Sequence, residues 1–288
     1  MLNKIRKLRI EEFPSSLFEI PQPPKDLYIE GVLPSKEFKF LTVVGSRKFS
    51  SYGEEACKKI ISGLSGEKVV IVSGLALGID SIAHKTALAV GIKTVAVPGS
   101  GLDRKVLHPH SNIELANKIV DSGGALLSEL PPERPAGIHT FPERNRIMAG
   151  LSQAILIIEA QDKSGTLITA RLAVEYNKDL LAVPGSIFSL NSSGTNRLIK
   201  QGATPINSSD DLLEALSLEK KNGSKELDTE GLTDNEKKIM EILSVEALTK
   251  DDLIRQTGIK INEVNVVLSM MEINGLIKEL GGKIQRKI

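Results

Sequence analysis

The sequence predicts an α/β protein with a doubly wound, mostly parallel sheet, followed by a small C-terminal winged-helix domain. Short runs rich in Val, Ile and Leu recur between residues 40 and 186, and each ends near Gly or Ser. Stretches with helical periodicity separate these runs, and strand-helix alternation of this kind is typical of right-handed βαβ units. Near the C-terminus, three short helical patterns precede a Gly-Gly turn between two short apolar segments, which is a winged-helix pattern.

The first segment, residues 1–38, is interrupted by prolines in "FPSSLFEIPQPPKDLYIEGVLP". Proline at this density is incompatible with a long helix. We expect an extended strap that packs on the next domain and is anchored by Leu17, Phe18, Leu27 and Tyr28.

The sheet domain is expected over residues 39–217. Its apolar runs are too short for helices and are apolar on both faces, as buried parallel strands are. The expected strands are 40–46, 69–74, 94–100, 125–129, 154–160 and 180–186, and the expected helices are 53–63, 78–90, 111–121, 145–151 and 167–177.

Residues 218–231, "LEKKNGSKELDTEG", are polar and contain glycine, which predicts a linker. Residues 232–288 are expected to form the winged helix. Its first two helices can begin at the capping residues Thr233 and Thr249, and a third is expected over about 261–274 before a β-hairpin.

Composition restricts the classes of function. The chain has 37 Lys and Arg against 36 Asp and Glu, so binding to a polyanion requires that cations gather on one face. Cys57 is the single cysteine, which excludes an intrachain disulfide and fits a reducing compartment. The N-terminus has no apolar signal region, and no apolar run is long enough to span a membrane. We therefore expect a cytoplasmic protein with no membrane partner.

Candidate binding residues follow two of the expected strands. "GSRK" places Arg47 and Lys48 after the first strand, and "KSGT" places Lys163 where a helix begins after the fifth. Ligands of open α/β sheets bind at the carboxyl ends of strands, and helix N-termini beside Lys or Arg bind phosphate. A third segment, "FPERNRIMAG" over 141–150, brings two arginines around an asparagine.

Enzymatic motifs are absent from the sequence. Neither G-x-x-x-x-G-K-[ST] nor G-x-G-x-x-G is complete. Glu129 and Glu159 are the best candidate acids, but neither has a neighbouring nucleophile or base. His108 and His110 lack further metal-ligand partners at a helical spacing, and His84 is expected to be a hydrogen-bonded structural histidine. We therefore expect no catalytic residue, cofactor or metal.

A series of motifs resembles the DprA/Smf family of bacterial DNA-processing proteins. The resemblance covers about residues 40–206, and the C-terminal winged helix is similar to that of many members. The motifs are "VVGSR" (43–47), "VSGLALGIDSIAHKTAL" (72–88), "GLDRKVLHPHSN" (101–112), "LLSELPP" (126–132), "FPERNRIMAGLS" (141–152), "KSGTLITA" (163–170), "AVPG" (182–185) and "GTNRLIKQGA" (194–203).

The resemblance implies an extended Rossmann-like fold without nucleotide chemistry. It also implies cooperative binding of single-stranded DNA, homodimerisation and loading of a RecA-type recombinase during natural transformation. In the family, the residues that match Arg47 and Lys163 line a pocket for the DNA backbone. We expect one of Arg144 and Arg146 to hold loop carbonyls or Glu143, and the other to reach a phosphate. The expected DNA-binding residues are Gly45, Ser46, Arg47, Lys48, Phe141, Arg144, Asn145, Arg146, Lys163, Ser164, Gly165 and Thr166.

The sequence departs from the family pattern at two places. The N-terminal helical domain of many relatives is nearly missing, so we expect no role for such a domain. His108 stands where the family usually has tyrosine before a proline, so the resemblance does not carry a stacking role over to that position.

Two other functions remain as alternatives. A LOG-type phosphoribohydrolase would need an acid where Thr169 and Ala170 stand. A duplex-binding regulator would read DNA with the third winged-helix helix, which offers Lys260 but also Glu263 and Glu272, whereas a groove-reading helix should present more Arg, Asn or Gln to base edges. The wing could touch phosphate through Lys283, Arg286 and Lys287, so we expect an auxiliary or protein-contact role for this domain.

Overall fold

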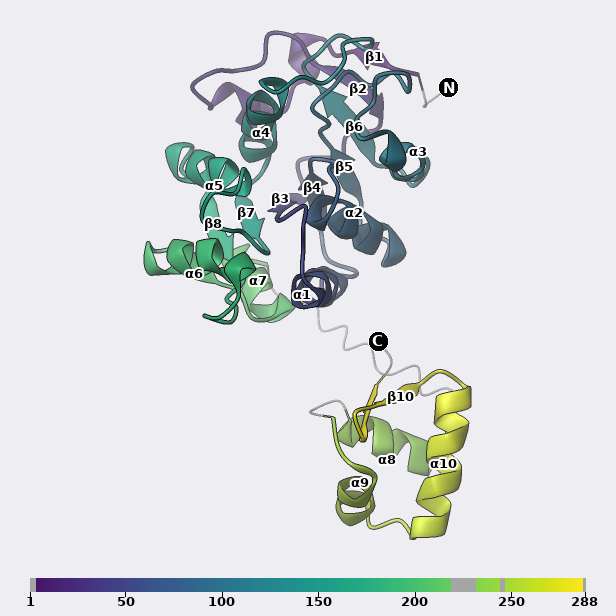
Figure 1. Cartoon of the computed structure of the whole chain (residues 1–288). Helices are drawn as coiled ribbons and strands as arrows, with labels where there is room; N and C mark the ends of the chain where they lie inside the picture. Colours follow the sequence, from purple (N-terminus) through teal and green to yellow (C-terminus); the bar gives the residue numbers. More distant parts are fainter. Residues whose placement is uncertain (1–3, 219–231, 244–246, 287–288) are drawn as a thin grey trace. The chain divides into compact units, whose positions relative to one another are not determined.

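The computed structural model describes residues 4–218, 232–243 and 247–286, and the chain divides into two compact units at the boundary between residues 221 and 222 (Figure 1). The predicted linker, 218–231, lies outside the described residues except for Leu218.

The first unit is built on a nine-stranded sheet with the order β1-β2-β6-β5-β4-β3-β7-β8-β9. Every pair of neighbours from β6 to β9 is parallel, whereas β2 is antiparallel to β6 and to β1. The predicted doubly wound, mostly parallel sheet is therefore confirmed. The strands are β1 Arg6–Lys7, β2 Tyr28–Gly31, β3 Lys39–Val44, β4 Val69–Ser73, β5 Thr94–Ala96, β6 Ala125–Ser128, β7 Ala154–Ile157, β8 Asp179–Ala182 and β9 Thr204–Pro205.

Helices cover both faces of this sheet, with α4, α5 and α6 on one face and α1, α2, α3 and α7 on the other (Figure 1). Successive side chains of a strand point to opposite faces: Val70 and Val72 of β4 join the core under α4 and α5, while Val69 and Ile71 join the core under α1 and α2. The helices are α1 Ser51–Ser62, α2 Ile79–Ala89, α3 Ile113–Asp121, α4 Thr140–Leu151, α5 Thr166–Glu175, α6 Ser193–Lys200 and α7 Ser209–Ala215.

The N-terminal segment adds β1 and β2 to one edge of the sheet, with two short 3-10 helices between them, η1 Ile10–Glu12 and η2 Ser15–Phe18. Leu17 and Leu27 are fully buried. Phe18, predicted as a further anchor, is 48% exposed and stacks on Phe13 with ring centroids 6.0 Å apart.

Helix α4 begins at Thr140, five positions before the predicted start at residue 145. The helix therefore includes Pro142. Pro142 lies in the first turn of α4, where backbone N–H groups have no intrahelical acceptor and proline is tolerated. Arg144 and Arg146, the two arginines of the segment 141–150, therefore both lie on α4.

The second unit has the predicted winged-helix elements and its own apolar core. The side chains of Thr233 and Thr249 accept hydrogen bonds from the backbone N–H groups of Glu236 (3.4 Å) and Asp252 (3.2 Å), as expected for helix caps. The elements are α8 Asp234–Ile242, α9 Lys250–Thr257, α10 Ile261–Ile273, β10 Ile277–Leu280 and β11 Lys283–Arg286.

Each helix within residues 4–218, 232–243 and 247–286 is too short or too polar to cross a lipid bilayer. Over the same ranges, no three His, Cys, Asp or Glu side chains gather in a way that could hold a metal ion.

Candidate functional site

A cavity of about 500 Å³ opens at the carboxyl end of the parallel sheet, beside the ends of β3 and β7. The chain proceeds from β3 to β4, β5 and β6 on one side and continues through β7, β8 and β9 on the other. This reversal is a topological switch point, the place where open α/β sheets bind ligands. We call this space the switch-point cavity.

The structure brings eleven of the twelve predicted residues together around the switch-point cavity, and only Arg146 is missing from its lining. The loop after β3, the first turns of α4 and the start of α5 each contribute. These eleven are Gly45, Ser46, Arg47, Lys48, Phe141, Arg144, Asn145, Lys163, Ser164, Gly165 and Thr166.

The loop after β3 is held against the N-termini of two helices. The N–H of Ile79 in α2 donates to the carbonyl of Ser46 (3.3 Å), and the hydroxyl of Thr166 in α5 donates to the carbonyl of Gly45 (3.2 Å). A Cβ at Gly45 would lie 2.7 Å from Ile79, and Gly78 has a φ of +83° and no space for a side chain against Ser46. Glycines at these positions thus bring the partial positive ends of α2 and α5 to the cavity.

Arg47 and Phe141 form the outer wall of the cavity. The guanidinium carbon of Arg47 lies 5.5 Å from the ring centroid of Phe141, within the range of a cation–π contact. The Phe141 ring also lies beside His108, with ring centroids 5.6 Å apart, and a Cβ at Gly99 would stand 2.5 Å from it. The absence of a side chain at Gly99 therefore lets the ring support Arg47.

Arg144 forms the cavity floor and is 8% exposed. Its Nη1 donates to the carbonyl of Val97, and its Nε donates to Oδ1 of Asn145 (3.1 Å). Asp80, which no sequence pattern singled out, also lines the cavity and accepts a hydrogen bond from the Gly74 N–H (3.1 Å). Burial raises the pKa of Asp80 and the charge of Arg144 opposes that rise, while burial lowers the pKa of Arg144 to about 10.

Arg146 lies outside the lining of this cavity. Its Nη2 binds both carboxylate oxygens of Glu129, with 2.5 Å to Oε1, and its Nη1 donates to the carbonyl of Gln22 (2.5 Å). Burial raises the pKa of Glu129, and the charge of Arg146 opposes this rise. Arg146 thus ties α4 to the end of β6 and to the N-terminal segment. Arg144 and Arg146 therefore have separate structural partners.

The other candidate acid and the buried histidine have structural partners as well. Glu159 accepts hydrogen bonds from the N–H (2.9 Å) and the hydroxyl (2.5 Å) of Ser50, the residue that caps α1. His84 is fully buried, with Nδ1 2.7 Å from the hydroxyl of Thr94, and burial lowers its pKa to about 3. The predicted hydrogen bond of His84 is thus present.

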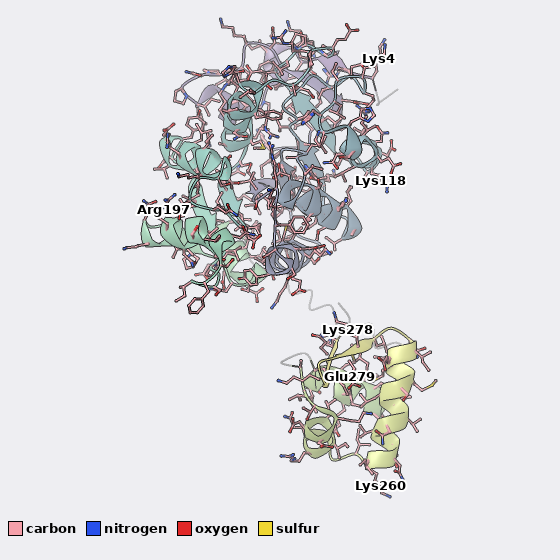
Figure 2. All side chains as sticks on the ribbon, in the orientation of Figure 1. Lys4, Lys118, Arg197, Lys260, Lys278 and Glu279 are labelled. Carbon is pink, nitrogen blue, oxygen red and sulfur yellow. The ribbon has the colours of Figure 1, made fainter. Side chains whose placement is uncertain are left out.

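In the second unit, the exposed side of α10 carries both apolar and polar side chains. Val266, Met270 and Ile273 are 64%, 50% and 79% exposed, and their spacing places them on one side of the helix. Figure 2 shows Lys260 at the N-terminal end of α10. Asn262, Asn265 and Ser269 are exposed as well, so α10 also offers side chains that can hydrogen-bond to base edges. Of the cations predicted for the wing, Lys287 lies outside the described residues.

Comparison with known proteins assigns the chain to a family. Residues 4–217 match DNA recombination-mediator protein A, and residues 224–283 match the DprA winged helix domain. The chain belongs to the DprA/Smf family. Relatives in this family include Protein Smf of Escherichia coli, 42% identical over 206 residues that cover 72% of this chain and 54% of that protein. The DNA processing protein DprA of Streptococcus pneumoniae is 43% identical over 201 residues, 70% of each chain.

Solved structures of DprA proteins share the fold. The Streptococcus pneumoniae protein has a TM-score of 0.68 and 39% identity, covering 74% of this chain and 75% of that one. The Helicobacter pylori protein, solved in work on its single-stranded DNA binding mode, has a TM-score of 0.65 and 28% identity, covering 74% and 96%. The present chain spans about half the length of the Escherichia coli relative.

Proposed function

We propose that this DprA-family protein binds single-stranded DNA in the switch-point cavity. The convergence of Arg47, Lys48, Arg144 and Lys163 on this one cavity carries the proposal. The net charge of the whole chain is only +1, so this local gathering supplies the attraction for a polyanion. The N-termini of α2 and α5 add partial positive charge suited to phosphate.

The arrangement favours one strand over a duplex. The cations lie in a recess between loops, which can take the backbone of a single strand with its bases free to turn. The binding energy is assigned mainly to phosphate contacts, and these carry no base sequence information. The single-strand binding of the Helicobacter pylori relative supports the same reading.

The wider role follows from the family. We propose that the protein protects incoming single strands and loads a RecA-type recombinase onto them in natural transformation and recombination, acting as a homodimer in the cytoplasm. The match to DNA recombination-mediator protein A over residues 4–217 supports this role.

The test is an anisotropy titration with a labelled single strand, a blunt duplex of equal length and a free nucleoside monophosphate. Tighter binding to the single strand is the expected result. Preference for the duplex would instead favour a winged-helix regulator, and release of free base from the monophosphate would favour the LOG-type hydrolase.

A further inference from the structure

A second cavity, of about 470 Å³, lies beside α1 and the loop after β8. In the described part of the chain the residues that line it are uncharged, and its hydroxyl groups come from Tyr52, Ser50, Ser186, Ser189 and Ser192. The ring of Tyr52 lies against Gly185, whose added Cβ would be 3.6 Å from it, and its hydroxyl donates to the Pro184 carbonyl (2.5 Å). We call this space the serine cavity.

The loop over residues 186–190 places three apolar side chains in solvent at the edge of the serine cavity. Ile187, Phe188 and Leu190 are 85%, 92% and 78% exposed. The loop is held by hydrogen bonds from the Phe188 N–H to the Ser186 hydroxyl (3.2 Å) and from the Ser189 N–H to the Ser186 carbonyl (3.0 Å). A contiguous apolar group held outward in this way is typical of a binding surface.

The serine cavity lies next to the switch-point cavity, because Lys48 lines the first and Ser50, two residues later, lines the second. The Asn191 side chain donates to the carbonyl of Lys48 (3.1 Å) and accepts from Nε2 of Gln161 (2.8 Å). Both of these partners line the switch-point cavity, while Ser192, next to Asn191 in the chain, lines the serine cavity. A strand that leaves the cations of the first cavity on this side can therefore reach the second.

We propose that the serine cavity and Phe188 form a base-binding subsite for the nucleotide that follows the strand segment held in the switch-point cavity; this inference rests on the proposed function. An uncharged lining excludes a phosphate as the preferred occupant, because a phosphate needs a cation or free N–H groups. Hydroxyl groups and ring faces suit a nucleobase, which has a polar edge and a π-face. Phe188 supplies the stacking face, and the uncharged polar lining of the serine cavity receives the edge of the base.

The test compares full-length wild type with Phe188→Leu and Phe188→Trp, using labelled oligodeoxythymidine and a strand of equal length without bases. Phe188→Leu keeps the apolar character but removes the ring, and is expected to weaken oligodeoxythymidine binding about tenfold, the scale of one lost base stack. Binding of the abasic strand and the salt dependence are expected to stay unchanged, because Phe188 meets no phosphate. Phe188→Trp keeps a stacking ring and is expected to keep the affinity.

Phe18→Leu is the matched control, since Phe18 is an exposed ring that lines neither cavity. Wild-type affinity of Phe188→Leu, or an equal loss on both strands, would overturn the subsite. If Phe188→Leu loses self-association in sedimentation while its DNA affinity per protomer is unchanged, the subsite is overturned. The loop over residues 186–190 would then bind a second copy of this chain. Lys163→Ala separates the two proposals, because it should weaken binding of both strands; if wild type binds neither strand, both proposals fail.

Discussion

The guanidinium group of Arg144 occupies the space that a side chain at residue 74 would need, since a Cβ added to Gly74 would overlap Nη1 and Cζ. Gly74 also donates its N–H to Asp80, and Arg144 donates to the carbonyl of Val97. The end of β4, the start of α2 and helix α4 therefore meet at one point, and this point is the floor of the switch-point cavity.

Gly74→Ala is expected to displace Arg144 and to lower both stability and DNA binding. Overpacking of a buried site costs about 1–3 kcal/mol, and the Val97 carbonyl would lose its charged donor. Urea unfolding and an oligonucleotide titration measure the two effects. Gly66→Ala is a useful control for glycine replacement, because nothing lies near an added Cβ there, although its φ of +84° adds strain. A Gly74→Ala protein with wild-type stability and affinity would show that Arg144 can relocate freely.

Arg47→Ala and Lys163→Ala are each expected to weaken single-strand binding by about 1–3 kcal/mol, the scale of a charge-assisted hydrogen bond that is no longer made. Each is also expected to flatten the plot of log K against log salt by about 0.7 per lost phosphate contact, with little dependence on base sequence. Both side chains are exposed, so the proteins should fold. The measurement is a salt titration with melting curves.

Lys118→Ala on α3 removes the same charge outside the cavity and serves as the control for this pair; Figure 2 marks its side chain. If the two cavity variants keep the wild-type affinity and slope while well folded, the DNA site lies elsewhere and the wing becomes the next candidate.

Arg146→Ala is expected to act on stability and not on DNA. Removing the guanidinium leaves the half-buried Glu129 carboxylate without its bidentate partner, at a cost of about 1–3 kcal/mol in the free energy of unfolding. Combining it with Glu129→Gln should restore part of this loss, because the unpaired charge is then absent. A flatter salt dependence of DNA binding in Arg146→Ala would contradict this assignment and place Arg146 on the strand.

The free energy of unfolding is expected to decrease as the pH is lowered below about 6.5, because of His84. The unfolded chain binds a proton on His84 near its ordinary pKa of 6.5, whereas in the folded chain burial lowers the pKa to about 3. Protonation therefore favours the unfolded state between these values, and the loss at two pH units below the ordinary pKa is about 3 kcal/mol. Urea unfolding from pH 7.5 to 4.5 measures it. His84→Gln should be less stable at neutral pH but should show a shallower decline, and parallel curves would refute the assignment.

Residues 1–217 alone are expected to keep most of the single-strand affinity, because every residue that lines the switch-point cavity lies in this part. Titration of this fragment and of residues 230–288 measures the division. The assignment is wrong if the C-terminal fragment binds as tightly as the full chain and the N-terminal fragment does not.

The central strands were predictable because each is a run of apolar residues buried on both faces. The edges of the sheet were not: β1 is exposed along its length, and β9 includes Pro205, which local propensity argues against. The pairing of these two strands depends on tertiary contacts, so their short sequences show no apolar pattern typical of a strand. Helix α6 was missed for a similar reason, since it begins with the small residues Ser193 and Gly194.

The site was largely predictable because glycine-rich loops after strands mark the rim of such a sheet. The roles of Arg144 and Arg146 were not, because residues two apart on an α-helix point about 200° from each other. The sequence can therefore separate the two side chains but cannot say which one faces the cavity. Asp80 was missed because its backbone partner at Gly74 is visible only in three dimensions.

Strand β3 pairs with β7, and Leu41 lies opposite Ala154. The strands between them in sequence, β4, β5 and β6, all lie on the other side of β3 in the sheet. During synthesis, β3 therefore presents an open edge until β7 has left the ribosome, and contacts this distant in sequence are slow to form. Because the switch-point cavity needs loops from both strands, a nascent chain acquires it only late. Until β7 is made, the open edge of β3 is exposed to strand-to-strand aggregation.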